Sequence, residues 1–301
     1  MASTPFGPVH TLVEREVTWF PRLIERARAT DGQPPFSDGS LVEFATGERT
    51  VLVIDESAIA LAAFPETEFV VAPEVRRQGL GTAMLEELIL RSERHGVGAL
   101  LVWAHGDHPG ARALAARYGF TVVRTLLHLR AEVAHTEPAS SRTAATATVE
   151  SFHPGTDDAE WLVLNALVFA DHPEQGGVSQ ADLDVLVAEP WFEADDFLLL
   201  RAGDGALIGY CWLKVETDGD SGNGNGNGEF YVVGVHPNSA GQGLGRVLVE
   251  AGLARLLARG IRSAHLYVEA ENLAAVHLYR SYGFVDDTID VQYARTTPPS
   301  T

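Results

Sequence analysis

The feature that most constrains this chain is an internal repeat. A shift of 164 residues aligns the chain with itself without a gap. In that register Gln-Gly-Leu-Gly at 78–81 falls on the same residues at 242–245, and Tyr-Gly-Phe at 118–120 falls on 282–284. Of the 50 positions from 71 to 120, 14 are identical to their counterparts. So many identities in one ungapped alignment are not expected by chance, so the sequence predicts two copies of one fold.

The length of 301 residues suits two domains of ordinary size. We predict an N-terminal domain over 1–135, a linker over 136–148 and a C-terminal domain over 149–301. The linker is rich in Ala, Thr and Ser, which is typical of flexible connections. A second low-complexity segment, 217–228, is dominated by Gly and Asn and predicts a long hairpin loop within the second copy.

Each copy shows the same order of elements. A helix is followed by two or three strands, an apolar strand, a glycine loop, a long helix, another strand, a short helix and a last strand. Apolar residues recur at helical spacing over 244–259, which predicts one buried face. Gly96 and Gly260 are expected to end the two long helices. The pattern predicts an α/β layered fold with a mixed sheet in each copy.

Composition excludes several classes of partner. Acidic residues outnumber basic ones 41 to 22, for a formal charge of -19, which argues against nucleic acid and anionic membranes. The same charge favours cationic substrates. The single cysteine, Cys211, excludes an intramolecular disulfide. With no signal peptide and no apolar run near the roughly 20 residues of a membrane span, we expect a cytoplasmic monomer.

The glycine loops predict an anion site. Glycines let the backbone turn sharply, and the N–H groups of the following helical turn then face a ligand such as a pyrophosphate. A dinucleotide-binding Rossmann loop would follow a domain's first strand, and a Walker loop would contain Gly-Lys-Ser/Thr, so neither fits. A simple turn into the helix remains an alternative.

Three segments of the second copy resemble the GNAT acetyltransferase superfamily: Val-Val-Gly-Val-His-Pro at 232–237, Gly-Gln-Gly-Leu-Gly-Arg at 241–246, and the run from Asn272 to Phe284. The tandem arrangement, His-Pro-Glu at 172–174 and Leu-Tyr-Val-Glu at 266–269 are similar to the mycothiol synthase family. The resemblance covers both halves. It implies two tandem GNAT domains, each a mixed, mostly antiparallel sheet flanked by helices.

That family acetylates the cysteinyl amine of a small-molecule cysteine–glucosamine–inositol pseudo-disaccharide, with acetyl-CoA as donor. The resemblance therefore implies acetyl-CoA binding in the second copy, and no metal. The retained loop of the first copy indicates that this copy binds a second CoA, or once did; the alternative is a purely structural role, supporting the second domain and lending one wall to the substrate cleft. The implied CoA contacts of the second copy are Val233, Gly234, Val235, Ala240, Gly241, Gln242, Gly243, Leu244, Gly245, Arg246, Asn272, Leu273, Ala274, Ala275, Val276 and His277. Those of the first copy are Phe69, Val70, Val71, Arg77, Gln78, Gly79, Leu80, Gly81 and Thr82.

The resemblance also assigns the chemistry to the second copy. Glu229 matches the general base and Tyr279 the general acid that protonates the leaving thiolate. Shifted by 164, Glu229 falls on Pro65 and Tyr279 on Ala115, although Glu66 could replace the base through a bulge. The first copy is therefore expected to be non-catalytic. Taken alone, Glu229 could equally be a solvated residue at a strand start, and Tyr279 a core aromatic.

Matches to the family's substrate contacts come from both copies: Asp38, Glu174, Lys214, Tyr267 and again Glu229. Asp38 departs from the glutamate of relatives, and Asp38, Glu174 and Lys214 each could be solvated surface residues. A metal site could use His105, Asp107 and His108. However, no fourth ligand lies at a sequence spacing typical of metal sites, so no metal site is predicted. Two other functions remain open: a GNAT enzyme for another amine, such as an aminoglycoside or peptide N-terminus, and a CoA-binding regulatory module without turnover.

Overall fold

The structure is a computed structural model, and it describes residues 6–12, 17–133, 147–170, 175–216 and 226–296. Glu174, nearly all of the predicted linker and most of the predicted loop 217–228 lie outside these ranges. The chain forms two compact units. Unit 1 comprises 1–127, 269–271 and 288–301, and unit 2 comprises 128–268 and 272–287.

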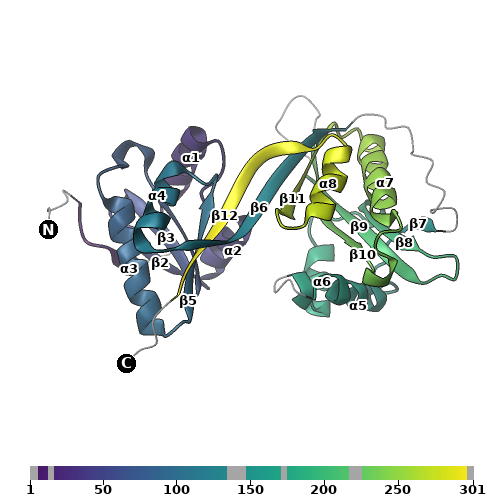
Figure 1. The fold of residues 1–301 in the computed structure, drawn as a ribbon, viewed down its shortest axis with the longest axis horizontal. Coiled ribbons are helices and arrows are strands. Elements are labelled where there is room, and N and C mark those ends of the chain that lie inside the picture. Colours follow the sequence, from purple (N-terminus) through teal and green to yellow (C-terminus); the bar gives the residue numbers. More distant parts are fainter. Residues whose placement is uncertain (1–5, 13–16, 134–146, 171–174, 217–225, 297–301) are drawn as a thin grey trace. The chain divides into compact units, whose positions relative to one another are not determined.

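The sheet of unit 1 has the strand order β1-β2-β3-β4-β5-β12 (Figure 1). Neighbouring strands are antiparallel, except that β4 and β5 are parallel. Its strands are β1 His10–Leu12, β2 Thr50–Ile54, β3 Ala58–Ala63, β4 Glu66–Val71, β5 Ala99–His105 and part of β12 Val285–Thr296. Its helices are α1 Phe20–Asp31, α2 Asp38–Thr46, α3 Leu80–His95 and α4 Pro109–Tyr118, with a 3-10 turn at Pro73–Val75.

Alternation along the strands of unit 1 builds a core on each face of the sheet. On β2, Leu52 and Ile54 pack with Met84 and Leu88 of α3. Val51 and Val53 of the same strand pack on the other face, against a cluster that includes Leu23 of α1. Successive side chains of a strand point to opposite faces, so one short apolar strand serves both cores.

The sheet of unit 2 has the order β6-β11-β10-β9-β8-β7, with β10 and β11 parallel. Its strands are part of β6 Thr121–Glu132, β7 Thr148–Ser151, β8 Phe197–Arg201, β9 Leu207–Glu216, β10 Asn227–Val235 and β11 Ser263–Glu269. Its helices are α5 Asp158–Val168, α6 Gln180–Val187, α7 Leu244–Ala258 and α8 Leu273–Ser281, with 3-10 turns at Gln175–Gly177, Ala194–Asp196 and Pro237–Ser239.

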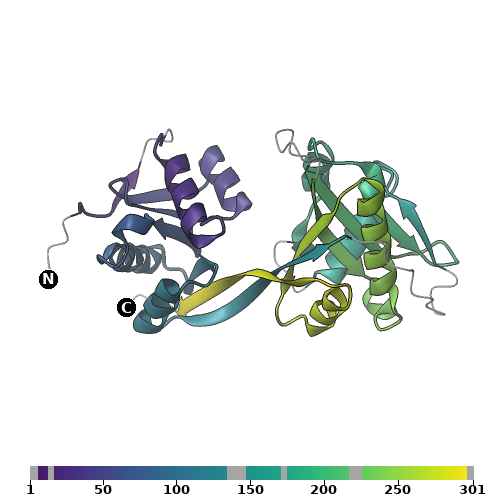
Figure 2. The ribbon, with the colours of Figure 1, turned by 90° about the horizontal axis from the view of Figure 1, so that it is seen from above.

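Helices cover both faces of this sheet. Tyr210 and Trp212 of β9 pack against Trp161 of α5. Cys211 between them points to the opposite face, where a Cβ at Gly252 of α7 would lie 3.2 Å from its Sγ. Figure 2 shows α7 running along its face of the sheet. Burial raises the pKa of the Cys211 thiol, so it stays an inert core residue.

The compact units differ from the contiguous boundaries predicted from the repeat. Residues 290–296 of β12, the last strand of the second copy, pair with β5 in unit 1. The end of β6, the last strand of the first copy, lies beside β11 in unit 2, where Val133 N–H donates to the Arg262 carbonyl at 2.9 Å. A sheet edge accepts any strand with matching pattern and length, so repeat boundaries alone do not fix which sheet the last strand joins.

The repeat itself is visible in side-chain contacts. The Tyr118 hydroxyl donates to Glu86 at 2.5 Å, and its counterpart Tyr282 donates to Glu250 at the same distance. These are residues of the Tyr-Gly-Phe motifs and of the long helices, so the tyrosine of each motif ties two helical segments together. This shared contact supports a packing role for the motif in both copies.

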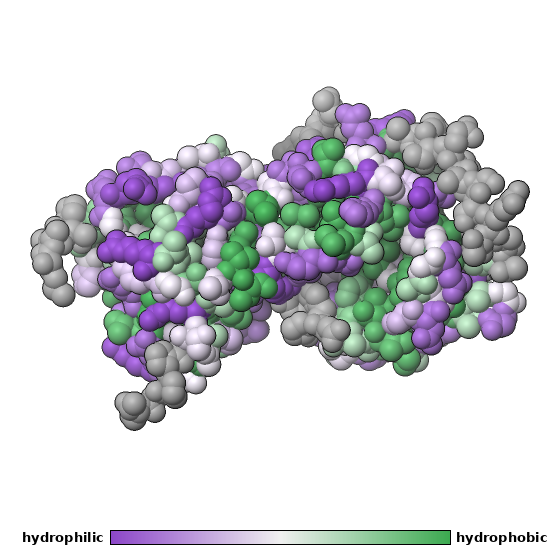
Figure 3. All heavy atoms as spheres, in the orientation of Figure 1, coloured by the Kyte–Doolittle hydropathy of each residue, from purple (hydrophilic) through white to green (hydrophobic). Residues whose placement is uncertain are grey.

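Buried charge is exceptional in this chain. Hydrophobic and hydrophilic residues are interspersed over the face seen in Figure 3. Among the described residues, the buried acids are Glu68, Asp157 and Asp196.

No described helix has the length and apolar character needed to span a membrane.

Candidate active site

The glycine loop of the second copy connects β10 to α7. Gly241 and Gly243 have φ of 76° and 79°, a conformation that glycine adopts without strain. Gly243 is the N-cap of α7, so the first N–H groups of this helix open toward the loop. Gly79, at the equivalent place before α3, has φ of 93°. Both copies therefore carry a preformed anion cradle at a helix N-terminus.

The strand before the loop separates from its parallel neighbour. Pairing of β10 with β11 runs from Asn227 to Glu229, whereas pairing with β9 continues to Val235. A Cβ at Gly234 would lie 2.7 Å from the Tyr210 ring, so only glycine fits this close approach. The separation leaves the backbone of 230–235 without a ladder to β11. An extended ligand arm can hydrogen-bond there as an added strand would.

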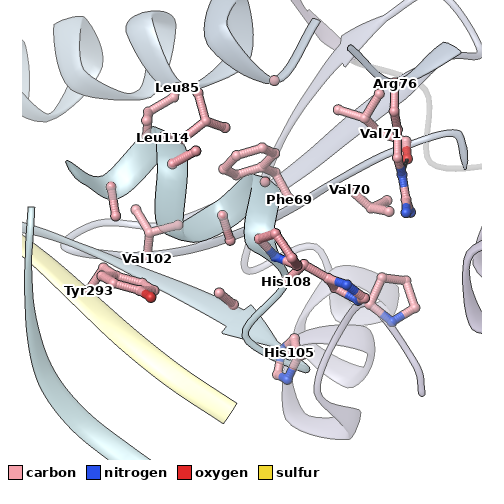
Figure 4. Close-up of a pocket in the computed structure, with 18 of the residues that line it drawn as sticks. Phe69, Val70, Val71, Arg76, Leu85, Val102, His105, His108, Leu114 and Tyr293 are labelled. Carbon is pink, nitrogen blue, oxygen red and sulfur yellow. Dashed lines mark hydrogen bonds between the residues drawn. The ribbon is translucent and has the colours of Figure 1, made fainter. Parts of the chain in front are cut away.

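A cavity of about 740 Å³ opens in unit 1. Figure 4 shows Phe69, Val70 and Val71 of β4 on one wall, with Leu114 of α4 beside them. All but one of the CoA contacts predicted for the first copy line it, the exception being Gln78. Such a volume holds a sizeable organic ligand. The cavity thus lies in the copy for which no catalysis is predicted.

The two copies differ in the side chain at the position of Tyr279. Its counterpart Ala115 lines the cavity of unit 1 with a small side chain. In unit 2 the centre of the Tyr279 ring lies 5.8 Å from that of Phe284. Tyr279 is buried, which together with Cys211 raises the pKa of its phenol. The hydroxyl therefore stays protonated near neutral pH and is available as a donor.

Glu229 lies where β10 and β11 separate. Its cross-strand partners are Lys214 on β9 and His265 on β11, and its Oε2 is 3.9 Å from Nε2 of His265. Strand register also corrects the alignment with the first copy. Glu66, rather than Pro65, pairs with Leu101, which is the repeat counterpart of His265. A register shift in β10 after Phe230 supplies the bulge that the one-residue offset requires.

The remaining predicted residues are distributed between the units. Asn272 caps α8, its side chain accepting the Ala275 N–H at 3.1 Å. Lys214 places its ammonium 5.5 Å from the centre of the Trp191 ring, and Tyr267 of β11 is half exposed. Asp38 is exposed in the first turn of α2 in unit 1. Its proximity to the residues of unit 2 remains a prediction.

Unit 1 contains a buried ionic cluster that the sequence did not predict. His105 of β5 lies between two carboxylates, with Nε2 3.6 Å from Glu68 and Nδ1 3.2 Å from Asp290. Glu68 also accepts hydrogen bonds from the Ser37 backbone at 3.0 Å and the Ser40 hydroxyl at 2.8 Å. Sequence separation hid the cluster, because its members come from β4, β5, β12 and the start of α2. Among the described residues, no group of three or more His, Cys, Asp or Glu side chains is arranged so that it could hold a metal ion.

The cluster shifts the pKa of its members in opposite directions. Burial by itself lowers the pKa of His105, but hydrogen bonds to Asp290 and Glu68 and their charges outweigh it and raise this pKa to about 9. Burial raises the pKa of Glu68, yet hydrogen bonds from His105, Ser40 and Ser37 leave it lower than usual. The folded protein thus holds a protonated imidazole between ionised carboxylates.

Unfolding should therefore depend on pH through His105. Its folded pKa exceeds the ordinary value of about 6.5, so its contribution is complete below that pH and is lost as pH rises through 9. We expect the unfolding free energy to fall by up to about 3 kcal/mol between pH 7 and 10. Urea unfolding of wild type and His105→Gln at both pH values measures this. The variant should lose the dependence, whereas the exposed control His153→Gln should keep it, and equal slopes in all three would contradict the assignment.

In each copy, one strand separates from its parallel neighbour and leads through a glycine loop to a helix N-terminus. This arrangement, present twice, defines an acetyltransferase architecture. The model of the acetyltransferase (GNAT) family matches residues 37–120 and 163–284. Among solved structures, a GCN5-related N-acetyltransferase from Sphaerobacter thermophilus superposes with a TM-score of 0.72 at 20% identity, covering 100% of this chain and 98% of that one. A tandem GNAT protein of clavulanic acid biosynthesis gives 0.70 at 15% identity, covering 97% and 100%. These two show the fold.

Sequence relatives narrow the family. The mycothiol acetyltransferase of Clavibacter michiganensis subsp. michiganensis is 43% identical over 284 residues, 91% of this chain and 89% of that protein. That of Geodermatophilus obscurus is 41% identical over 288 residues, 91% and 92% of the two chains. The chain belongs to the mycothiol acetyltransferase family of GNAT enzymes.

Proposed function

We propose that unit 2 transfers the acetyl group of acetyl-CoA to the cysteinyl amine of 1D-myo-inositol 2-(L-cysteinylamino)-2-deoxy-glucopyranoside, forming mycothiol. One observation carries the assignment to unit 2. Only this copy has both a carboxylate at the strand separation, Glu229, and a buried phenol on the following short helix, Tyr279. Family membership supports the acceptor.

The residues of unit 2 fit acetyl-CoA. Its pyrophosphate would lie on the N–H groups between Ala240 and Arg246, where Gly241 and Gly243 keep the cradle open. The pantetheine arm would bind along Val233–Val235, whose β11 side is free of a ladder. Bound there, acetyl-CoA supplies the activated acetyl group. The first turn of α8, from Asn272 to His277, would flank the thioester.

The side chains of unit 2 then provide acid and base. An α-amine has a pKa of about 7.7–8, so near neutral pH it needs only a modest base to attack as the neutral form. Glu229 takes up its proton, with Lys214 opposite it on β9. The Val235 backbone N–H donates to the carbonyl oxygen as it gains charge. Tyr279 donates its phenolic hydrogen toward the departing sulfur.

Acceptor binding is proposed to use Lys214, Tyr267 and Glu229 of unit 2, together with Asp38 and Glu174. Carboxylates can bind sugar hydroxyls and an ammonium group, and a lysine can donate to inositol oxygens. Tyr267 shows half of its surface to solvent, as a ring that stacks on a ligand would.

The test is a direct assay. The protein is incubated with acetyl-CoA and the desacetyl pseudo-disaccharide, and product mass and free thiol are followed. We expect one acetyl group on nitrogen and one CoA thiol per turnover. Aminoglycosides and peptides with a free N-terminus serve as competing acceptors. Preferential acetylation of one of these would replace the proposed acceptor, and binding without turnover would indicate a CoA-binding module.

A second CoA in unit 1 is part of the proposal. Arg77 lines the cavity there, and its loss removes a cation that would face the phosphates. We expect Arg77→Ala to weaken one of two acetyl-CoA sites about tenfold by calorimetry, since a charge-assisted hydrogen bond contributes about 1.5–3 kcal/mol. Turnover should stay within about twofold of wild type, because the proposed base and acid, Glu229 and Tyr279, belong to unit 2. Loss of turnover in a stable Arg77→Ala protein would show that the assignment of catalysis to unit 2 is wrong.

A further inference from the structure

Titratable side chains form a row across unit 2. Lys214 on β9 and His265 on β11 flank Glu229 in register. The His265 ring contacts that of His128 on β6 edge to face, with 5.2 Å between centroids. His128 in turn places Nδ1 3.0 Å from Asp287, at the start of β12. The row therefore continues beyond the proposed base through two imidazoles to a second carboxylate.

The row leads from the interior to solvent. The Glu229, His265 and His128 side chains are 18%, 24% and 17% exposed, whereas that of Asp287 is 40% exposed. The Tyr267 ring lies 4.7 Å from that of His128 and covers one side of it. The imidazoles are thus largely shielded, and water meets the row chiefly at its Asp287 end.

The first copy provides an internal control. Glu66 takes the register position of Glu229, but its β5 neighbour is Leu101, the counterpart of His265. The counterpart of His128 is Gln292, whose amide donates to Glu66 at 3.0 Å. Leucine and glutamine cannot carry a proton. The copy without the phenol therefore also lacks both imidazoles, although it keeps the carboxylate.

The net reaction explains why a path to solvent is useful. An acceptor that arrives as ammonium loses two protons when its nitrogen becomes an amide, and the released sulfur gains one. One of the two nitrogen protons restores the phenolic hydrogen that Tyr279 gives to the sulfur, and the other must reach water in each turnover. The Glu229 carboxylate is mostly buried, and it must be deprotonated again before the next acceptor binds.

We propose that His265 and His128 are positioning and relay residues that carry this proton from Glu229 to Asp287. This rests on the proposed role of Glu229. The amine N–H bond breaks as Glu229 Oε2 takes the proton, and the new O–H bond breaks as His265 Nε2 accepts it. Rotation of the two adjacent rings then brings their nitrogens together, so that His265 passes its other ring proton to His128 Nε2. The Nδ1–H of His128 delivers a proton to Asp287 and so to water. Glu229 returns to the carboxylate and both rings to neutral.

The test uses His265→Ala and His128→Ala in the full chain. Each should lower kcat about 10- to 100-fold, at or below the low end of the effect of a group in direct acid–base contact, while KM for acetyl-CoA changes less than about twofold. Added imidazole should restore kcat in a saturable manner, because a free ring can occupy the vacated volume. His153→Ala is the matched control, since His153 also pairs with an aspartate, Asp157 at 3.3 Å, but is 71% exposed near the sheet edge.

The outcomes separate the relay from the proposed function. Wild type alone reports on the acceptor, and variants are compared with it on the amine that wild type acetylates best. A kcat within about twofold of wild type, or a loss in a stable, acetyl-CoA-binding variant that imidazole does not restore, would overturn the relay. His265→Leu introduces the residue found at the equivalent position of the first copy, Leu101. This variant should show the same loss of kcat, and imidazole should not restore it, because leucine leaves no room for the added ring.

Discussion

Replacing Tyr279 by phenylalanine is expected to lower kcat about 100-fold while leaving KM for acetyl-CoA nearly unchanged. The substitution keeps the ring that packs against Phe284 and removes only the hydroxyl. Since burial raises the phenol pKa, Tyr279 does not titrate below pH 10. The pH–rate profile of the variant should therefore run parallel to that of wild type, at lower rate.

Steady-state kinetics from pH 6 to 10 measures this effect. Tyr282→Phe is the matched control, because it also removes a hydroxyl from this segment but one that donates to Glu250. That control should lose about 1 kcal/mol of stability and keep its kcat. A Tyr279→Phe enzyme with kcat within about threefold of wild type would remove the residue from the acid role.

The second large effect concerns stability. Asp196 is fully buried at the start of β8 and accepts hydrogen bonds from two arginines of unit 2, Arg255 at 2.7 Å and Arg259. Arg255 belongs to α7, the helix that carries the glycine loop, and Arg259 follows it directly. Asp196→Asn should lower the unfolding free energy by about 3 kcal/mol, because it removes the buried carboxylate charge that two partly buried guanidinium groups share.

Urea unfolding with tryptophan fluorescence suits this test, since three of the five tryptophans, Trp161, Trp191 and Trp212, lie in the second copy. The neighbouring Asp195→Asn makes the same chemical change at an exposed carboxylate that accepts only the Ser151 hydroxyl among the described contacts. It should cost under about 1 kcal/mol. Similar losses for the two variants would show that the buried pair contributes no more than a surface one.

Much of the site could be predicted because it depends on local geometry. A glycine loop between a strand and a helix fixes its own backbone, so Gly241 and Gly243 take the expected positive φ. The boundaries of α3 and α7 follow similarly from apolar periodicity and from the glycines beside them. By contrast, α2 and α6 were not expected, because each is short and weakly amphipathic.

The ungapped alignment of the two copies misplaced one residue of the candidate site. A gapless shift placed Pro65 opposite Glu229, whereas strand pairing places Glu66 there, since a bulge in β10 absorbs one residue. Bulges depend on how two strands pair, which one strand's sequence does not specify.

The sequence by itself determined the duplicated fold, the two anion cradles, and the copy that keeps both Glu229 and Tyr279. These follow from spacing and residue type, which act over a few neighbouring residues. Only the tertiary structure decided which side chains meet across strands: His105 with Glu68 and Asp290, Glu229 with His265, and His265 with His128. Residues far apart in sequence become neighbours through strand order and register, because each added strand sets a new row of partners.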